Sequence, residues 1–309
     1  IWNQKCCCCD IMNFNRVHVI YWYYFHSFNQ DESLSRVWSQ RSPSSDENYT
    51  CTGKDSMSLY TISRKQVANL KHLDNTSNIV AYMAIPTHNF RENVTPYLNM
   101  VDPLYILEKP HGHSFEDFES IQSFVRKNNL KILYADHYLG KSVLDRIETP
   151  DNLESIQVVL HESADINNRI NYFDSVGIVR DMYQSHCVLL FASVLTKYTN
   201  KSRREILREM RYIKPRITKI LKTDAYKGLA PTQCRISLKY DDILLEADIA
   251  KMVDEKKGIY INHSDFYNLS SGPCPYEKLF EKIRTRDESF FLDEEEIKCL
   301  WDHFSIIEC

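Results

Sequence analysis

An eight-residue segment, "YADHYLGK" at residues 134–141, places an acid, an imidazole, a phenol and an ammonium around one glycine. Imidazole moves protons near neutral pH, and an ammonium supplies a fixed positive charge that suits an anion. The whole chain has only seven glycines in 309 residues. The segment therefore has two interpretations: a polar loop that follows a strand, or a site for a small anionic substrate.

The elements before the segment favour the second interpretation. Buried strands are predicted at 78–86, 104–110 and 130–136, with a short or interrupted helix at 87–100 and an amphipathic helix at 114–129. Ser114 and Asp117 have the spacing of a capping box. Alternating strands and helices predict a parallel sheet with right-handed crossovers, and such sheets bind ligands outside the carboxyl ends of their strands. Asp136 and the residues after it leave the third strand at that edge.

After residue 136 the pattern becomes α+β. A strand is predicted at 155–162, and 233–240 with 242–248 read as an antiparallel pair. Helices are predicted at 178–195, 202–213, 276–283 and 293–304. The second half of 178–195 is almost wholly apolar and is expected to be buried. The arginines of 202–213 alternate with glutamates, which predicts a solvated face.

The pattern therefore predicts an α/β domain with a parallel sheet followed by an α+β domain with a mainly antiparallel sheet. The predicted divisions are a poorly defined N-terminal segment at 1–48, a parallel-sheet domain at 49–135 and an α+β domain at 136–309. The apolar segment 17–28 reads as a buried strand or a disordered stretch.

Composition excludes several classes of function. The net charge of −4 shows no basic excess, so neither nucleic acid nor an anionic membrane surface is an expected partner. Residues 17–28, the longest apolar and aromatic stretch, fall short of the roughly 20 residues of a membrane span. The ten cysteines include the run Cys6–Cys9 but form no CxxC pair with zinc-like partners, so no metal site is predicted. Scattered single cysteines fit a reducing, cytoplasmic compartment.

Three motifs identify a family resemblance. "EKPHG" at 108–112, "DHYLGK" at 136–141 and "YFDSVGIVRDMYQSH" at 172–186 closely resemble glucose-6-phosphate dehydrogenases, in the same order and at similar spacing. The resemblance covers roughly 49–309 with gaps. It implies that residues 49–135 are a remnant of a Rossmann-like parallel-sheet coenzyme domain and that residues 136–309 are the α+β substrate and C-terminal domain with a mainly antiparallel sheet. It implies a cytoplasmic oxidoreductase of the oxidative pentose phosphate pathway, which oxidises glucose 6-phosphate to the lactone with NADP. It also implies a homo-oligomer.

The resemblance assigns roles to individual residues. His186 would be the general base that takes the proton of the C1 hydroxyl, with Asp136 orienting its imidazole. The sugar phosphate and neighbouring hydroxyls would be bound by His137, Tyr138 and Lys141. Sugar hydroxyls would donate to Glu162 and Asp181, while Lys109 would lie between sugar and coenzyme. Pro110 is a candidate for a cis peptide bond.

Each residue also has a structural interpretation that the sequence leaves open. His186 could be a satisfied core histidine, Glu162 plain surface and Lys141 a solvated loop lysine. On an ideal α-helix, Asp181 and His186 would lie about 140° apart, so they could only flank a ligand.

Two departures from the family pattern keep a second function open. No glycine precedes Gly53, so the glycine-rich loop that cradles the coenzyme pyrophosphate is missing and weak coenzyme binding is expected. Where the family has a further lysine and arginine on the phosphate, an ungapped alignment gives Ala225 and Ala230, with Lys227 two residues from the first. The alternative is a non-catalytic relative that keeps sugar-phosphate binding or subunit contacts.

Overall fold

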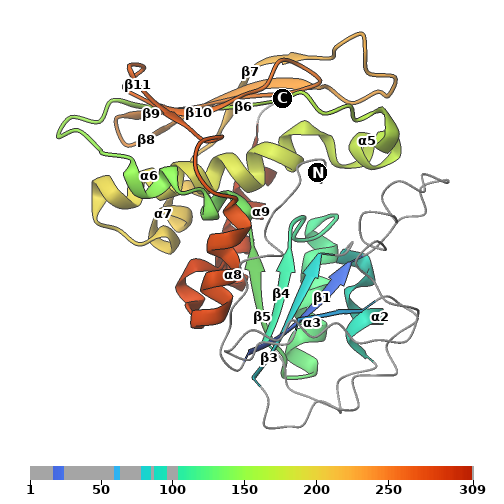
Figure 1. Cartoon of the computed structure of the whole chain (residues 1–309). Coiled ribbons are helices and arrows are strands. Elements are labelled where there is room, and N and C mark those ends of the chain that lie inside the picture. The colour runs from blue at the N-terminus through green and yellow to red at the C-terminus, as the bar shows by residue number, and fades with distance from the viewer. Residues whose placement is uncertain (1–16, 24–58, 63–77, 85–86, 96–103, 308–309) are drawn as a thin grey trace. The chain divides into compact units, whose positions relative to one another are not determined.

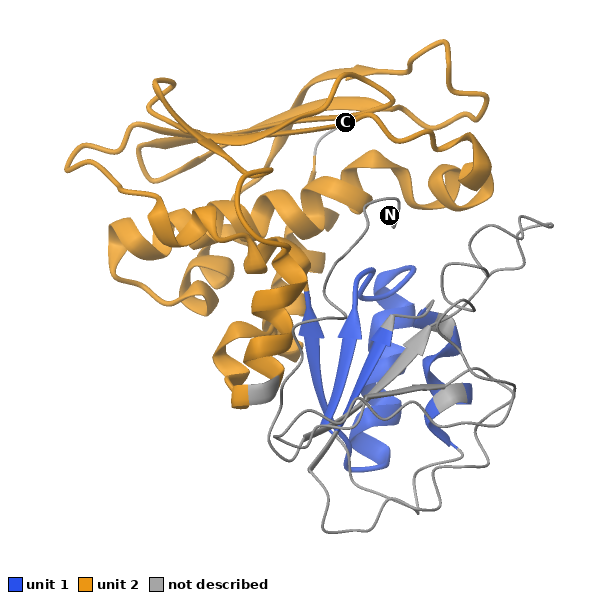
Figure 2. Cartoon of the chain, in the orientation of Figure 1, with its two compact units in different colours: residues 1–135 blue, residues 136–309 orange. Residues whose placement is uncertain are grey.

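The computed structural model describes residues 17–23, 59–62, 78–84, 87–95 and 104–307. The chain divides into two compact units, residues 1–135 and 136–309 (Figure 2). Each unit contains its own sheet (Figure 1).

Unit 1 contains a five-stranded sheet in the order β2-β1-β3-β4-β5, and all neighbouring strands are parallel. The strands are β1 (Val17–Tyr23), β2 (Leu59–Ile62), β3 (Asn78–Ala84), β4 (Leu104–Glu108) and β5 (Lys131–Ala135). The predicted parallel sheet is confirmed. The order reverses next to β1, because β2 lies on one side of it and β3 on the other, and this is where doubly wound sheets bind ligands.

The sheet begins earlier in the chain than the sequence predicted. We expected the coenzyme domain to start at residue 49, yet β1 lies between β2 and β3. The strand interpretation of 17–28 thus holds for Val17–Tyr23. Our interpretations of residues 1–16, with the run Cys6–Cys9, and of residues 24–28 concern segments outside the described residues.

The helices of unit 1 are η3 (Thr87–Asn89), α2 (Phe90–Val94) and α3 (Phe115–Lys127). Helix α3 begins as predicted, because the Ser114 hydroxyl accepts a hydrogen bond from the Asp117 N–H at 3.2 Å. Asp117 also accepts from the Thr87 hydroxyl at 2.8 Å, which joins α3 to the segment after β3. Strand β4 is buried along its whole length and leads into the cis Lys109–Pro110 bond.

Unit 2 contains a six-stranded sheet in the order β11-β10-β6-β9-β8-β7. Its strands are β6 (Ser155–Glu162), β7 (Arg216–Leu221), β8 (Gln233–Tyr240), β9 (Ile243–Lys251), β10 (Lys256–Ile261) and β11 (Asp265–Asn268). The β8–β9 pair is antiparallel as predicted. Only β6 and β9 pair in parallel within this sheet, so their carboxyl ends, Glu162 and Lys251, lie opposite each other.

On one side of this sheet, α5 (Ile170–Ile178), the π-helix η7 (Val179–Cys187) and α6 (Val188–Thr199) contact its strands (Figure 1). Helix α7 (Arg203–Met210) packs on α6, α9 (Glu294–Ser305) packs on η7 and α7, and α8 (Pro275–Thr285) packs against residues 137–140. Shorter segments are η5 (His137–Gly140), α4 (Val143–Arg146), η6 (Asn167–Arg169) and η8 (Glu288–Phe290). No helix in the described part of the chain is long and apolar enough to cross a membrane.

One helical prediction needs correction, because the helix predicted at 178–195 is two kinds of helix, a π-helical first half and an α-helical second half that is largely buried. The solvated face predicted for α7 is confirmed for Arg204 and Arg208, which are exposed. The three arginines of α7 also pair with acids at the start of α9: Arg203 with Glu296, Arg204 with Asp293 and Arg208 with Glu295. The sequence pattern showed the charges of one helix but not the second helix that matches them.

Candidate active site

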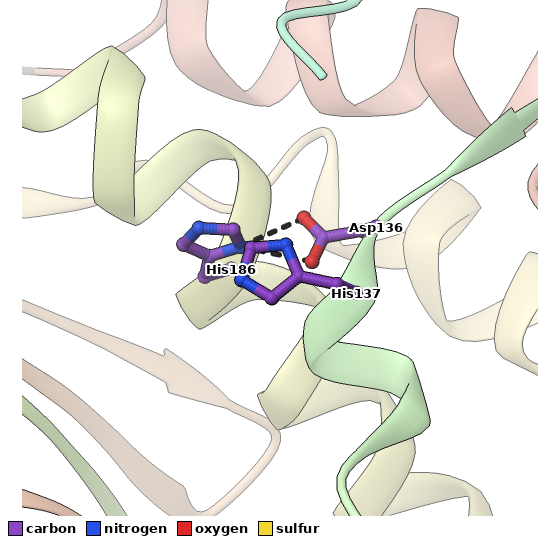
Figure 3. A group of neighbouring side chains, drawn as sticks. All are labelled: Asp136, His137 and His186. Carbon is purple, nitrogen blue, oxygen red and sulfur yellow. Dashed lines mark hydrogen bonds and ion pairs between the residues drawn. The ribbon is translucent and has the colours of Figure 1, made fainter. Parts of the chain in front are cut away.

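Asp136 and His186 form a buried pair at the centre of the candidate site. The Nδ1 atom of His186 lies 2.9 Å from Oδ1 and 2.8 Å from Oδ2 of Asp136, as Figure 3 shows. Asp136 is fully buried and His186 is 3% exposed. The sequence places Asp136 directly after β5 and His186 fifty residues later on η7, and the fold brings them into contact as predicted.

The local backbone fixes the carboxylate. Asp136 is the N-cap of η5, and its Oδ1 accepts the Tyr138 N–H at 2.9 Å. Because an ionised carboxylate only accepts hydrogen bonds, Nδ1 of His186 must carry the proton and Nε2 the lone pair. This tautomer is the one that a general base acting through Nε2 requires.

Aromatic rings hold the imidazole in place. The Tyr138 ring lies 3.9 Å from the His186 ring between centroids, and His137 meets the same ring edge-on at 5.1 Å. His137 in turn stacks on Tyr276 of α8 at 5.3 Å. At Gly140, a Cβ would collide with the carbonyl oxygen of Pro275, so glycine allows η5 to approach the start of α8.

The segment also provides hydrogen-bond donors for an anion. Burial raises the pKa of Tyr138 well above its usual value, with carboxylates including Glu162 adding to the effect, so its hydroxyl keeps its proton. The ammonium of Lys141 lies 5.6 Å from the centre of the Tyr138 ring. Burial and the neighbouring Lys257 lower the pKa of Lys141. A neutral hydroxyl and a partly desolvated ammonium suit a phosphate group.

A second cluster joins three strands, β6, β9 and β10, to η7. Lys251 lies 2.5 Å from Oε2 of Glu162 and 3.0 Å from Oδ2 of Asp181, and Lys257 lies 3.5 Å from Oε1 of Glu162. Burial opposes the ionisation of Glu162, but Lys251 and Lys257 outweigh it and lower the pKa of Glu162 to about 2. Glu162 and Asp181 were predicted as site residues, whereas both lysines were missed.

The π-helix changes the predicted relation between Asp181 and His186. An α-helix would place them about 140° apart, but π-helical hydrogen bonds join residues five apart, so these two lie about one turn from each other. They therefore project from similar sides of the helix, and the α-helical estimate was wrong.

Family models match most of the chain. The model described as "Glucose-6-phosphate dehydrogenase, NAD binding domain" matches residues 28–145, and "Glucose-6-phosphate dehydrogenase, C-terminal domain" matches residues 140–233. The chain belongs to the glucose-6-phosphate dehydrogenase family.

Individual family members are similar over parts of their length. The glucose-6-phosphate 1-dehydrogenase of Helicobacter pylori is 28% identical over 156 residues, which cover 46% of this chain and 34% of the relative. That of Hanseniaspora uvarum is 25% identical over 257 residues, covering 75% of this chain and 46% of the relative. The chain thus spans between a third and a half of these two relatives.

Solved structures of the family share the fold. A "Glucose-6-phosphate dehydrogenase in complex with its substrate glucose-6-phosphate" superposes with a TM-score of 0.61 at 16% identity, covering 95% of this chain and 91% of that one. The enzyme of Mycobacterium avium gives a TM-score of 0.57 at 15% identity, covering 96% and 91%. At this identity the likeness concerns the fold alone.

Other positions of the family pattern belong to different segments of the chain. Lys109 follows β4 in unit 1 and its role stays a prediction. Lys227 is exposed, and its backbone N–H donates to Asn167. Asp174 accepts the N–H groups of Leu229 and Ala230, which fixes the loop where the family has its further phosphate-binding residues. The sequence motif contained Asp174 but did not reveal this contact.

The parallel sheet fits a nucleotide coenzyme of the family only in part. Its strand order, with the reversal beside β1, is that of a dinucleotide-binding sheet. The residues after β1 do not fit, because 24–52 contain no glycine and a pyrophosphate loop needs backbone without Cβ atoms. The strand order thus supports a coenzyme, whereas the sequence after β1 predicts weak binding of its pyrophosphate.

Proposed function

We propose that this chain carries the substrate half of a glucose-6-phosphate 1-dehydrogenase site, for oxidation of glucose 6-phosphate to the lactone with NADP as the acceptor. The observation that carries the proposal is the buried Asp136–His186 pair beside the donors of residues 137–141. Family membership supplies the substrate class.

In the proposed reaction His186 takes the proton of the C1 hydroxyl on Nε2. Asp136 stabilises the imidazolium that forms, because its carboxylate already holds the Nδ1 proton. NADP, when bound, supplies the acceptor for the hydride that leaves C1. His137, Tyr138 and Lys141 would bind the phosphate and nearby hydroxyls.

The remaining predicted residues complete the substrate site. Glu162 and Asp181 would accept hydrogen bonds from sugar hydroxyls, and Lys109 would have the role between sugar and coenzyme that the family resemblance implies. We also infer from the family a homo-oligomer in the cytoplasm; sedimentation velocity of the purified chain tests the self-association.

A second function is favoured by one observation. Because residues 24–52 contain no glycine, the chain could bind the sugar phosphate without oxidising it. In that case it would act as a non-catalytic relative that keeps sugar-phosphate binding or subunit contacts.

Two measurements on the purified chain separate these functions. Calorimetric titration measures glucose 6-phosphate binding, and NADPH absorbance after addition of NADP measures turnover. Binding with turnover supports the dehydrogenase, whereas binding without turnover supports the non-catalytic relative. Absence of glucose 6-phosphate binding would reject the dehydrogenase and the sugar-phosphate-binding relative, and leave a relative that keeps only subunit contacts. Glucose without phosphate is the control ligand that should bind more weakly.

A further inference from the structure

Lys251 is a buried cation in a place where the strand pattern calls for an apolar side chain. Along β9 the buried positions alternate through Ile243, Leu245, Ala247 and Ile249, and the next position in that series is Lys251. A lysine is almost never this buried unless it is paired. Its ammonium must therefore serve the groups that surround it.

Those groups are two of the predicted sugar-binding carboxylates. The parallel pairing of β6 and β9 puts Glu162 directly opposite Lys251, and η7 brings Asp181 to the same ammonium. Two of the three ammonium protons are thereby committed. Lys257 approaches only the other oxygen of Glu162, at 3.5 Å, and also contacts Glu255.

The contact of one Lys251 ammonium with both Glu162 and Asp181, here called the Lys251 bridge, determines what the two carboxylates can do chemically. Buried carboxylates that share a site repel each other, and without a cation one of them takes up a proton and becomes a donor. With Lys251 between them, both stay ionised and keep lone pairs for hydroxyl donors. The charge of Asp181 raises the pKa of Glu162, and Lys251 makes the largest contribution that lowers it.

We propose that Lys251 is a positioning residue that holds Glu162 and Asp181 as a pair of ionised acceptors for the hydroxyl groups of the sugar. This inference rests on the proposed function, and it makes Lys251 a determinant of selectivity for a sugar phosphate over phosphate alone. The phosphate donors belong to residues 137–141, so the two parts of the ligand are recognised by separate groups.

The first test compares two ligands by calorimetry. Lys251→Gln should weaken glucose 6-phosphate binding by about tenfold or more, as expected when hydrogen bonds to charged groups are lost, and change inorganic phosphate binding less than about twofold. Lys251→Arg, which keeps the charge, should recover much of the affinity. The control is Lys256→Gln on β10, where the lysine lies over the Tyr260 ring, and it should bind both ligands normally. Equal losses for both ligands, or no loss, would overturn the proposal.

A second set of variants covers the case in which Lys251→Gln does not fold. In the double variant that carries Glu162→Gln and Asp181→Asn, Lys251 has no carboxylate left to position. Adding Lys251→Met should then change glucose 6-phosphate affinity less than about twofold, because the effect of a residue disappears once its partners are removed. A large further loss would mean that Lys251 contacts the ligand directly and would overturn the positioning role.

A ligand-free measurement separates failure of this inference from failure of the proposed function. Carbon-13 titration of the carboxyl groups should show that Glu162 takes up its proton at distinctly higher pH in Lys251→Gln than in the wild type. The same shift should be smaller in Lys251→Arg. If the wild type binds no glucose 6-phosphate, the proposed function fails while this shift still supports the bridge. An unchanged Glu162 titration overturns the bridge whether or not the sugar phosphate binds.

Discussion

The Asp136–His186 pair derives its properties from burial and from fixed partners. Asp136 is fully buried, accepts a backbone N–H and faces a single imidazole. In such an environment an acceptor of fixed position selects the tautomer of its histidine. The pair is therefore suited to moving a proton at one defined atom.

Removing the imidazole should abolish proton transfer but leave the fold intact. We expect His186→Asn to lower kcat by about 10²- to 10⁴-fold, the usual contribution of general base catalysis, and to change glucose 6-phosphate affinity little. NADPH absorbance and calorimetry measure the two quantities. The matched control is His161→Asn, which removes the imidazole of a half-buried pair between His161 on β6 and Asp248 on β9 and should keep full kcat. Turnover of His186→Asn within tenfold of the wild type would remove His186 from the mechanism.

His303 should give the stability of the chain an acid-sensitive component. Its Nδ1 donates to the Met210 carbonyl, its Nε2 accepts from the Tyr183 hydroxyl, and burial lowers its pKa to about 4. An unfolded histidine has a pKa of about 6.5, so unfolding takes up a proton between these values. Stability is complete above about pH 6.5 and is lost as the pH falls toward 4, by about 3 kcal/mol over that window.

Urea unfolding at several pH values checks this component. His303→Gln should flatten the dependence of the unfolding free energy on pH between 7 and 4. Tyr183→Phe is the control, because it removes the partner hydroxyl but leaves the titrating imidazole, so its pH dependence should remain. A His303→Gln variant with the slope of the wild type would contradict the assignment.

Among individual residues, the sequence identified the candidate site residues that lie in short motifs. Asp136, His137, Tyr138 and Lys141 are contiguous, and the resemblance named them with His186. Lys251 was missed because its partners are distant in sequence, although a lysine that continues the buried alternation of β9 was a visible signal. Asp174 was within a motif, but its role depends on a loop more than fifty residues later.

Helices α7 and α9 are joined by ion pairs of unequal exposure. The side chain of Arg203 is 18% exposed, and it donates to Glu296 and to the carbonyl of Phe291. The pair of Arg208 with Glu295 is much more exposed, at 46% and 40%. Burial therefore predicts that the two pairs contribute very differently to stability.

Replacing the buried arginine should be far more costly than replacing the exposed one. We expect Arg203→Met to lower the free energy of unfolding by about 3–5 kcal/mol, because Glu296 would stay buried without its cation. Arg208→Met, the matched control, should cost less than about 1 kcal/mol. Urea unfolding at neutral pH measures both, and equal losses would show that burial does not decide the contribution.

Periodicity in the sequence located most elements but not their hydrogen-bonding pattern. The apolar spacing of 178–195 predicted one buried helix, and a helix is present throughout. The wider turn of its first half adds a residue per turn, which an α-helical pattern cannot reveal. Capping residues were more informative, since Ser114 begins α3 as the spacing predicted.

Across the whole chain, the sequence predicted the succession of strands and helices but not which strands distant in sequence pair with each other. The parallel sheet follows from strands that alternate with helices in sequence, so β3, β4 and β5 were found in order. The position of β6 between β10 and β9 depends on pairings about ninety residues apart, and no local pattern specifies them. Strand β1 was separated from its neighbours in the sheet by a long polar stretch, which hid its membership of the same domain.

The orientation of His186 depends on the π-helical winding of the main chain as well as on the side chains that surround it. If the same residues wound as an ordinary α-helix, Asp181 and His186 would lie about 140° apart instead of about one turn apart. Every functional group would still be encoded, yet the proton acceptor would point elsewhere. In this segment the winding of the main chain should matter as much as the identity of the residues.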